Sequence, residues 1–562
     1  MKIKNNKLFW LLGLILVFSC ETTELDLLVD PNVPTPEALD TDTNLNFIQF
    51  QLAKFFEDAT ESGGEAVRLE YMFNTYEINF INNNASNSGM WTTAYTNILN
   101  EVEALIPIAT AEGRFRHLGV ARIIRAYTMM TLVDYFGDIP YSEALQGNNG
   151  VIFPGLDSGS DVYDAALTEL DLALADFANI DAALTPEFND LYYGENSSTT
   201  MDNWTKFANT LKFKYYLNKR LIDPTGSAAG INALLASGDI ITSSSEDFKW
   251  SSGTSINPQS THPYYVEEYL AANPGEYIPN YLMWALAEEK GFEDPRLRYY
   301  VYRQVNSFPT DPAILDNEIS CWNDPRPTTY DPIDAMQAVP LPFCSLFGRG
   351  DGYWGRDHAN REGIPPDTGK RSTFGVYPVG GRFDDNDADS IDAGDGLQGA
   401  GIWPIMMDSF VYFMRAEAAI YLGTSDDAAA MLEQGVRASL NTVTSFLPNP
   451  GDFSNTASAT DIDDYVADVM ASYMAAATDA ERMDIIGKEY WIAMYGNGVE
   501  GYNLYRRTGA PGNLQPTLLG TGSFPRSFLY PNVAVDRNIN ISQKPGLAVQ
   551  VFWDNNPADF IQ

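Results

Sequence analysis

Apolar residues recur at helical spacing over much of the chain. Between residues 44 and 59 this spacing predicts a first helix, with apolar positions Phe47, Ile48, Leu52, Phe55 and Phe56. The strongest block covers residues 116–135 and is followed by Gly137, which can adopt a left-handed cap, and Pro140, which stops a helix. Further helices are predicted at residues 163–177, 204–221, 408–422, 425–440, 462–477 and 480–495. Paired helices of this length are typical of tetratricopeptide-like hairpins, so the sequence predicts a mainly α fold.

The helical pattern is interrupted between about residues 243 and 401. This stretch is rich in Pro, Gly, Asn and aromatic residues and has few periodic segments. Irregular segments of this length in a compact domain are usually functional. The sequence therefore predicts one domain over residues 44–562. A helical scaffold at about 44–242 and 402–510 would carry a loop-rich, ligand-binding insertion, and segment 511–562 would complete the domain.

The first twenty residues have a pattern of their own. Three lysines precede an apolar run, residues 8–18, that is too short to span a bilayer, and Ser19 and Cys20 follow it. This order predicts a lipoprotein signal peptide, residues 1–19, with lipidation at Cys20. The alternative is an ordinary secretory signal with an incidental cysteine. Acidic residues, prolines and threonines at residues 20–43 predict an extended tether between a stable lipid anchor and the folded domain.

The net charge of the chain limits the classes of molecule that it can bind. The chain has 35 basic and 75 acidic residues, a formal net charge of −40. Without the three lysines of the first twenty residues the charge is −40 − 3 = −43. Such a surface repels phosphate backbones, which argues against a nucleic-acid partner. No later apolar stretch is long enough to span a membrane, so we expect attachment to the membrane through the lipid.

Cysteine and histidine give little sign of a metal centre. Two cysteines remain after lipidation, Cys321 and Cys344, and the sequence leaves open whether they form a disulfide or stay free. The three histidines are far apart in the sequence and lack metal-ligand spacing. We therefore expect no cofactor, with one possible exception in an acidic segment at residues 384–395. Its carboxylates at Asp385, Asp387 and Asp389 could bind calcium as a structural ion.

That segment does not match an EF-hand. Ser390 stands where the turn glycine belongs, and Gly396 stands where the bidentate glutamate belongs. A solvated acidic loop is the alternative interpretation.

Several short motifs occur in a characteristic order. They lie at residues 125–127, 134–140, 415–419, 489–491, 498–509, 528–531 and 551–554. Together with the signal containing Cys20, they resemble the SusD/RagB family over nearly the whole chain. The resemblance implies a SusD-like helical fold and a lipid-anchored protein on the cell surface, at the outer membrane. It also implies binding without catalysis. The ligand would be a nutrient, usually a glycan, which is passed to a SusC-like TonB-dependent transporter.

Parts of these motifs have a structural explanation. Glu417 and Glu489 lie among apolar helix residues, where an unpaired carboxylate is costly. We expect nearby arginines to neutralise them; the candidates are Arg415, Arg506 and Arg507. The motif glycines suit turns or close backbone approaches, at Gly137, Gly498 and Gly501. The motifs are therefore interpreted as markers of the fold rather than of the binding site.

Candidate ligand-binding residues are aromatic. The apolar face of a pyranose desolvates well against a flat aromatic ring, and its hydroxyls need polar partners. Trp91 follows a polar loop that contains Asn82, and Trp322, Tyr353 and Trp354 lie in the irregular insertion. Each of these aromatic residues could instead pack beneath its own loop.

Three functions are compatible with this pattern: glycan capture, capture of peptides or other nutrients on the same fold, and an exported glycoside hydrolase. The hydrolase has the least support: no nucleophile elbow, zinc-protease helix or phosphate-binding loop is present, and although 75 acidic residues offer many carboxylate pairs of the kind a glycosidase uses, the sequence does not reveal their separation.

Overall fold

The prediction of a mainly α fold is confirmed by the computed structural model. It describes residues 40–81, 83–179, 188–194, 198–272, 274–307, 311–313, 324–344, 352–361, 370–519 and 522–561. In the first half, the principal helices are α2 (Thr41–Val67), α4 (Ala85–Thr92), α5 (Asn100–Glu112), α6 (Phe115–Phe136), α7 (Gly159–Ala178), α8 (Ser198–Lys219) and α9 (Pro224–Ser237). A π-helical segment, η2 (Thr93–Leu99), joins α4 to α5, and a short helix, α3 (Tyr76–Asn79), precedes α4. In the second half they are α15 (Asp408–Leu422), α16 (Ala428–Ser445), α17 (Ala459–Ala475), α18 (Asp479–Ala493) and α19 (Gly498–Thr508).

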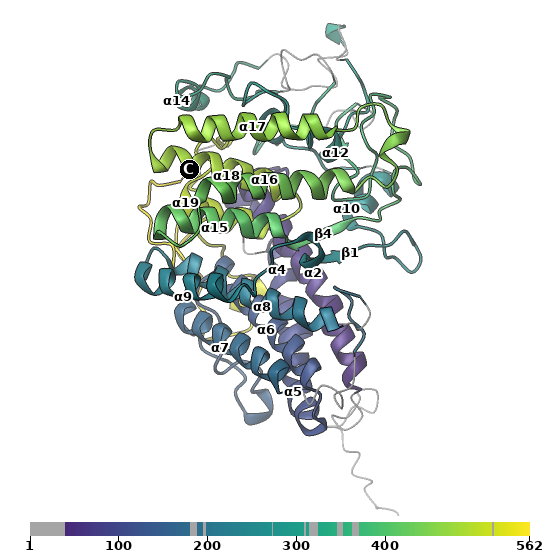
Figure 1. Cartoon of the computed structure of the whole chain (residues 1–562). Coiled ribbons are helices and arrows are strands. Elements are labelled where there is room, and N and C mark those ends of the chain that lie inside the picture. The colour runs from purple at the N-terminus through teal and green to yellow at the C-terminus, as the bar shows by residue number, and fades with distance from the viewer. Residues whose placement is uncertain are drawn as a thin grey trace, which may run out of the picture.

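Successive helices pack side by side in two groups (Figure 1). Helices α6, α7, α8 and α9 form the first group, and α15 to α18 form the second. Helix α15 packs against α8 and α9 and so joins the groups. This arrangement gives the helical-hairpin scaffold expected from the sequence.

Helix ends are fixed by local hydrogen bonds. The side chain of Asp40 caps α2 by accepting from the Thr43 amide at 3.2 Å, and Asp427 caps α16 by accepting from the Ala430 amide at 2.9 Å. Gly137 follows α6 with a φ of +75° and donates its backbone N–H to Val133. A positive φ favours glycine, but with a ψ of −115° Gly137 does not adopt the predicted left-handed helical cap, so that detail of the prediction is wrong although the helix ends where expected.

The described part of the insertion has little regular structure. Its described elements are η4 (Ser244–Glu246), β1 (Phe248–Ser251), α10 (Pro263–Tyr265), η5 (Val266–Leu270), α11 (Asn280–Ala287), α12 (Leu297–Tyr300), β2 (Val301–Tyr302), η6 (Thr328–Tyr330), α14 (Asp331–Asp334) and β3 (Thr373–Phe374), and β4 (Ile402–Met406) follows it directly. Strand β1 pairs antiparallel with β4, and β2 with β3. Trp284, Tyr300 and Trp403 are fully buried in the common hydrophobic core. The insertion is thus packed onto the scaffold rather than separate from it.

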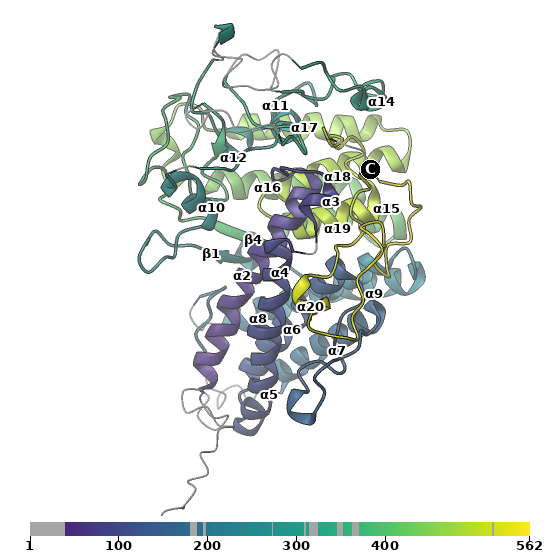
Figure 2. The same cartoon turned by 180° about the vertical axis from the view of Figure 1, so that it is seen from behind.

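Helix α2 and the C-terminal segment connect distant parts of the chain. Helix α2 contacts α4, α6, β4 and α19. The C-terminal segment contains a short helix, α20 (Asn532–Val535), which lies beside α4 (Figure 2). The buried indole of Trp553 donates to Asp134 of α6 at 3.0 Å. None of the described helices is both long and apolar enough to cross a membrane.

Candidate functional site

The two motif glutamates are buried and paired, as expected. Glu417 of α15 accepts from Arg507 at 2.6 and 2.7 Å and from Arg220 at 2.8 Å. Burial alone would raise the pKa of Glu417, but these guanidinium groups lower it below its ordinary value. The expectation that Arg415 could pair with Glu417 is wrong, because Arg415 binds Asp426 at 2.8 Å instead.

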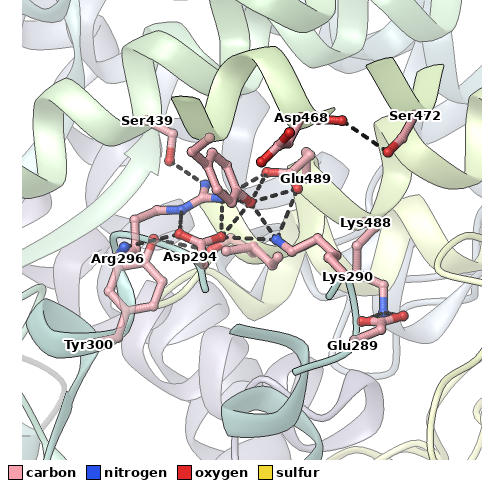
Figure 3. Close-up of polar contacts among 12 residues, drawn as sticks. Glu289, Lys290, Asp294, Arg296, Tyr300, Ser439, Asp468, Ser472, Lys488 and Glu489 are labelled. Carbon is pink, nitrogen blue, oxygen red and sulfur yellow. Dashed lines mark hydrogen bonds and ion pairs between the residues drawn. The ribbon is translucent and has the colours of Figure 1, made fainter. Parts of the chain in front are cut away.

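Glu489 belongs to a second buried network (Figure 3). Arg296 contacts both Asp294 and Glu489 at 2.7 Å, and Lys290 contacts both at 3.1 Å. The hydroxyl of Tyr465 donates within the same network. Both cations come from the segment before α12. The prediction that a motif arginine neutralises Glu489 is therefore wrong. Every charge in this network has a protein partner, which supports the interpretation of the motifs as fold markers.

Trp91 lies in the core rather than on the surface. Its ring is 7% exposed and packs against Tyr95, Phe136 and Tyr530, with centroid distances of 4.9, 5.2 and 6.1 Å. This geometry supports the packing alternative for Trp91. The neighbouring Asn82 lies outside the described residues.

Two of the candidate aromatic residues in the insertion are buried as well. Tyr353 and Trp354 are 1% and 4% exposed. Arg303 lies over the Tyr353 ring at 4.6 Å, and Tyr277 contacts the Trp354 ring edge-on. Trp322 lies outside the described residues. Ligand contact by these residues stays a prediction.

The acidic segment is largely engaged by the protein. Asp385 accepts from the backbone amides of Ser454 and Asn455 at 2.8 Å, and Arg382 pairs with Asp387 and lies 3.8 Å from Asp389. Within the described ranges, no group of three or more His, Cys, Asp or Glu side chains is placed to hold a metal ion. Calcium binding here remains a prediction.

Cys344 is disulfide-bonded, which favours the disulfide alternative of the sequence analysis. The other candidate, Cys321, lies outside the described part of the chain.

A group of neighbouring carboxylates lies near the end of α2. We call Glu61, Glu65, Glu70, Glu267 and Glu276 the acidic cluster. The first two lie on α2, Glu70 follows it, and the last two lie on and after η5. Glu267 and Glu276 are exposed and the other three are half-buried. No member forms an ion pair with a described lysine or arginine.

Crowding of these groups changes their ionisation. Desolvation and then repulsion between neighbouring carboxylates raise the pKa of Glu276 to about 8 and that of Glu267 to about 7. The same causes, in the same order, raise the pKa values of Glu65 and Glu70 well above the ordinary range. Lys54 acts in the opposite direction on Glu61 and Glu267, and Arg371 does so on Glu276, but neither offsets the increase.

Two neutral polar groups border the acidic cluster. The amide of Asn79 donates to Glu65 at 2.5 Å. The hydroxyl of Tyr264 is buried beside Glu70 and interacts with its carboxyl group. The predicted polar loop is next to them, because Asn84 donates to the Asn79 carbonyl and caps α4. Sequence reasoning missed this cluster, although Glu57, Glu61 and Glu65 show the four-residue spacing of one helix face.

A cavity of about 490 Å³ lies on another part of the surface, between α3 and the C-terminal segment. Arg68 and Arg526 line it. Arg68 donates to the carbonyls of Ala66 and Gln515, and Arg526 binds Asp554. Both arginines therefore hold the local fold together.

The buried carboxyl of Asp58, one helical turn before the acidic cluster, predicts a pH effect. Desolvation, with repulsion from Glu57 and Glu61, raises its pKa to about 7 despite Lys54. The folded state then holds a proton that the unfolded state releases near pH 4, so this group destabilises the fold as pH rises from 4 to 7. The contribution is on the order of 3–4 kcal/mol. We expect Asp58→Asn to raise the melting temperature more at pH 8 than at pH 4.5. Equal changes in melting temperature at both pH values would contradict a raised pKa for Asp58.

Comparisons with known proteins give the family. A SusD-like family model, described as "Starch-binding associating with outer membrane", matches residues 34–311 and 367–531. No curated protein matches the chain.

Solved structures agree on the fold. A chitin-binding protein is 20% identical with a TM-score of 0.65, and the match covers 92% of this chain and 100% of that one. A chitin-binding SusD homolog from Flavobacterium johnsoniae is 18% identical with a TM-score of 0.60, covering 92% and 98%. A SusD homolog from Bacteroides fragilis is 17% identical with a TM-score of 0.62, covering 91% and 99%. Identities this low show a shared fold alone, but the family model spans most of the sequence. The chain belongs to the SusD-like family.

Proposed function

We propose that this protein is a cell-surface lipoprotein that binds oligosaccharides or polysaccharides and delivers them to a SusC-like TonB-dependent transporter. The match to a family described as starch-binding and associated with the outer membrane carries the proposal. The chitin-binding proteins of the same fold support a glycan as the ligand class. Lipidation at Cys20 would hold the domain at the outer membrane.

A binding role fits the site better than catalysis. The networks around Glu417 and Glu489, which contain the motif glutamates, are internally paired and leave neither carboxylate free for catalysis. A capture protein of this kind acts as a lid, so that ligand held against the transporter is committed to uptake when the lid closes. The protein is thus expected to retain a glycan without releasing cleavage products.

Retention on immobilised polysaccharides tests the proposal. We expect the mature chain to be retarded in an affinity gel by at least one polysaccharide, without release of reducing sugar. Trp322→Ala should weaken retention about tenfold at unchanged melting temperature, because one stacking platform is lost. Trp250→Ala is the matched control, since Trp250 is a half-buried surface tryptophan that packs against Phe50 and Tyr192. Absence of retention on every polysaccharide would overturn glycan capture.

A further inference from the structure

We propose that a cleft near the C-terminus is a further glycan-binding site, in which neutral pyranose units stack on Tyr421 and Phe560. The inference rests on the proposed function of glycan capture and adds to it a site and a class of sugar. The cleft is a cavity of about 330 Å³, which we call the C-terminal cleft. Its lining includes Arg220, Tyr421, Asp484, Gly509, Asn556 and Phe560.

Two aromatic rings border the C-terminal cleft with much of their surface exposed. Tyr421, at the end of α15, is 40% exposed, and Phe560, near the end of the chain, is 38% exposed. Trp91 and Trp354, by contrast, are buried. The apolar face of a pyranose stacks on an exposed aromatic ring, and the contact removes apolar surface of both from water.

The protein holds both rings in position without a ligand. The Arg220 guanidinium lies over the Tyr421 ring, 4.1 Å from its centroid, and is itself bound to Glu417 at 2.8 Å. Because Arg220 covers one face of the ring, a sugar would stack on the other. Phe560 rests against Gly509, where an added methyl group would lie 3.1 Å from the ring. Rings that are already positioned lose little conformational entropy when a ligand binds.

Polar atoms at the C-terminal cleft are available to the hydroxyls of a sugar. Asp484 accepts from the Gly512 amide through Oδ1 at 2.6 Å, and Asn556 donates through Nδ2 to the Arg506 carbonyl at 2.8 Å. Across the described ranges, no group hydrogen-bonds to Asp484 Oδ2, Asn556 Oδ1 or the Tyr421 hydroxyl. A carboxylate, an amide carbonyl and a phenol beside aromatic rings form the mixed lining that is typical of small-molecule sites.

The charges at the C-terminal cleft favour a neutral glycan. Arg220 and the neighbouring Arg507 both bind Glu417, and Asp484 supplies a second negative charge, so the four groups balance. The formal net charge of −40 further disfavours carboxylated or sulfated sugars. Small-molecule sites have volumes of about 300–1,000 Å³, and this cavity lies at the lower end of that range. We therefore expect it to hold a short stretch of a neutral sugar chain.

One wall of the C-terminal cleft lies outside the residues that the family model matches. The match ends at residue 531, so it includes Tyr421 and Asp484 but not Asn556 or Phe560. The C-terminus lies near α18 in both views (Figures 1 and 2). Family membership alone therefore does not predict this site.

Variants of the two aromatic residues test the proposal by affinity electrophoresis of the mature chain. The gels contain one of four neutral polymers (amylopectin, mixed-linkage β-glucan, galactomannan or glycol chitin) or the acidic polymer polygalacturonate. We expect retention by at least one neutral polymer and none by polygalacturonate. Tyr421→Ala and Phe560→Ala should each weaken retention about threefold to tenfold, whereas Tyr421→Phe, which keeps the ring, should bind like the wild type. Phe50→Ala is the control, because it removes an exposed aromatic ring from α2 and should leave retention unchanged.

Hydrogen exchange provides a readout that does not depend on the variants. Addition of the retaining polymer should slow deuterium exchange of the wild-type backbone at residues 508–512 and 555–561. This result would place the sugar in the C-terminal cleft even if an alanine variant were unstable.

Each other outcome has a definite meaning. Retention of the wild type that neither alanine variant weakens would overturn the C-terminal cleft as a binding site and leave glycan capture intact. A loss in Tyr421→Phe as large as in Tyr421→Ala would overturn stacking as the mode of binding. Retention by polygalacturonate as strong as by the neutral polymers would overturn the preference for neutral sugars. Absence of retention by all five polymers would overturn glycan capture and this inference with it.

Discussion

Replacing Glu417 by Gln is expected to destabilise the fold by about 3–5 kcal/mol. The wild-type carboxylate is fully buried and neutralises Arg507 and Arg220 through three short contacts. Gln keeps the shape but loses the charge, so two buried guanidinium groups remain without a counterion. Their other contacts do not compensate: Arg507 also donates to Asn218, and Arg220 to the Arg507 carbonyl, both neutral acceptors. Chemical denaturation at pH 7 gives the difference in free energy of unfolding.

The matched control is Glu433→Gln. Glu433 makes the same kind of contact with Arg437, at 3.0 Å, but both side chains are well exposed. An exposed pair contributes about 1 kcal/mol or less. If the two variants lost similar stability, the Glu417 pair would not act as a buried ion pair, and its place in the family motifs would need another explanation.

The helices were predictable because their apolar periodicity is strong, and the differences have local causes. The first helix was predicted over residues 44–59 but extends from Thr41 to Val67. Its last part contains Ser62, Gly63 and Gly64, which give no apolar signal. These small residues lie where α19 approaches, so tertiary packing rather than periodicity maintains the helix there.

The sequence could predict that the buried glutamates pair with cationic side chains, but not which side chains these are. Arg415 is two residues from Glu417 on the same helix, and residues at that spacing do not face each other. Arg507 was among the predicted partners, whereas Arg220 directly follows α8, nearly two hundred residues earlier in the chain. Such contacts depend on how α8, α15 and α19 meet, which spacing along the chain does not reveal.

Only one side of the candidate site could be predicted from the sequence. One side of the acidic cluster can be recognised as a four-residue repeat of glutamates on a predicted helix. The other side, Glu267 and Glu276, lies in an irregular stretch whose position depends on long-range contacts. The aromatic residues show the complementary problem, because Trp91 and Trp354 have the composition of a binding platform but are buried.

Gly498→Ala is expected to destabilise the protein by at least about 3 kcal/mol or to prevent folding. Gly498 begins α19 against α2, and its amide donates to Thr60 at 2.6 Å. A methyl group there would lie 2.0 Å from the Thr60 carbonyl oxygen and 2.1 Å from the Gly64 nitrogen. Both are backbone atoms of a long helix, so neither can move aside cheaply, and α19 would have to separate from α2. Gly451→Ala, with nothing near its added methyl, should change stability by about 0.5 kcal/mol or less. Thermal unfolding of both variants provides the comparison. A Gly498→Ala protein as stable as Gly451→Ala would show that the close approach of α2 and α19 is not required, and that the predicted role of this motif glycine is wrong.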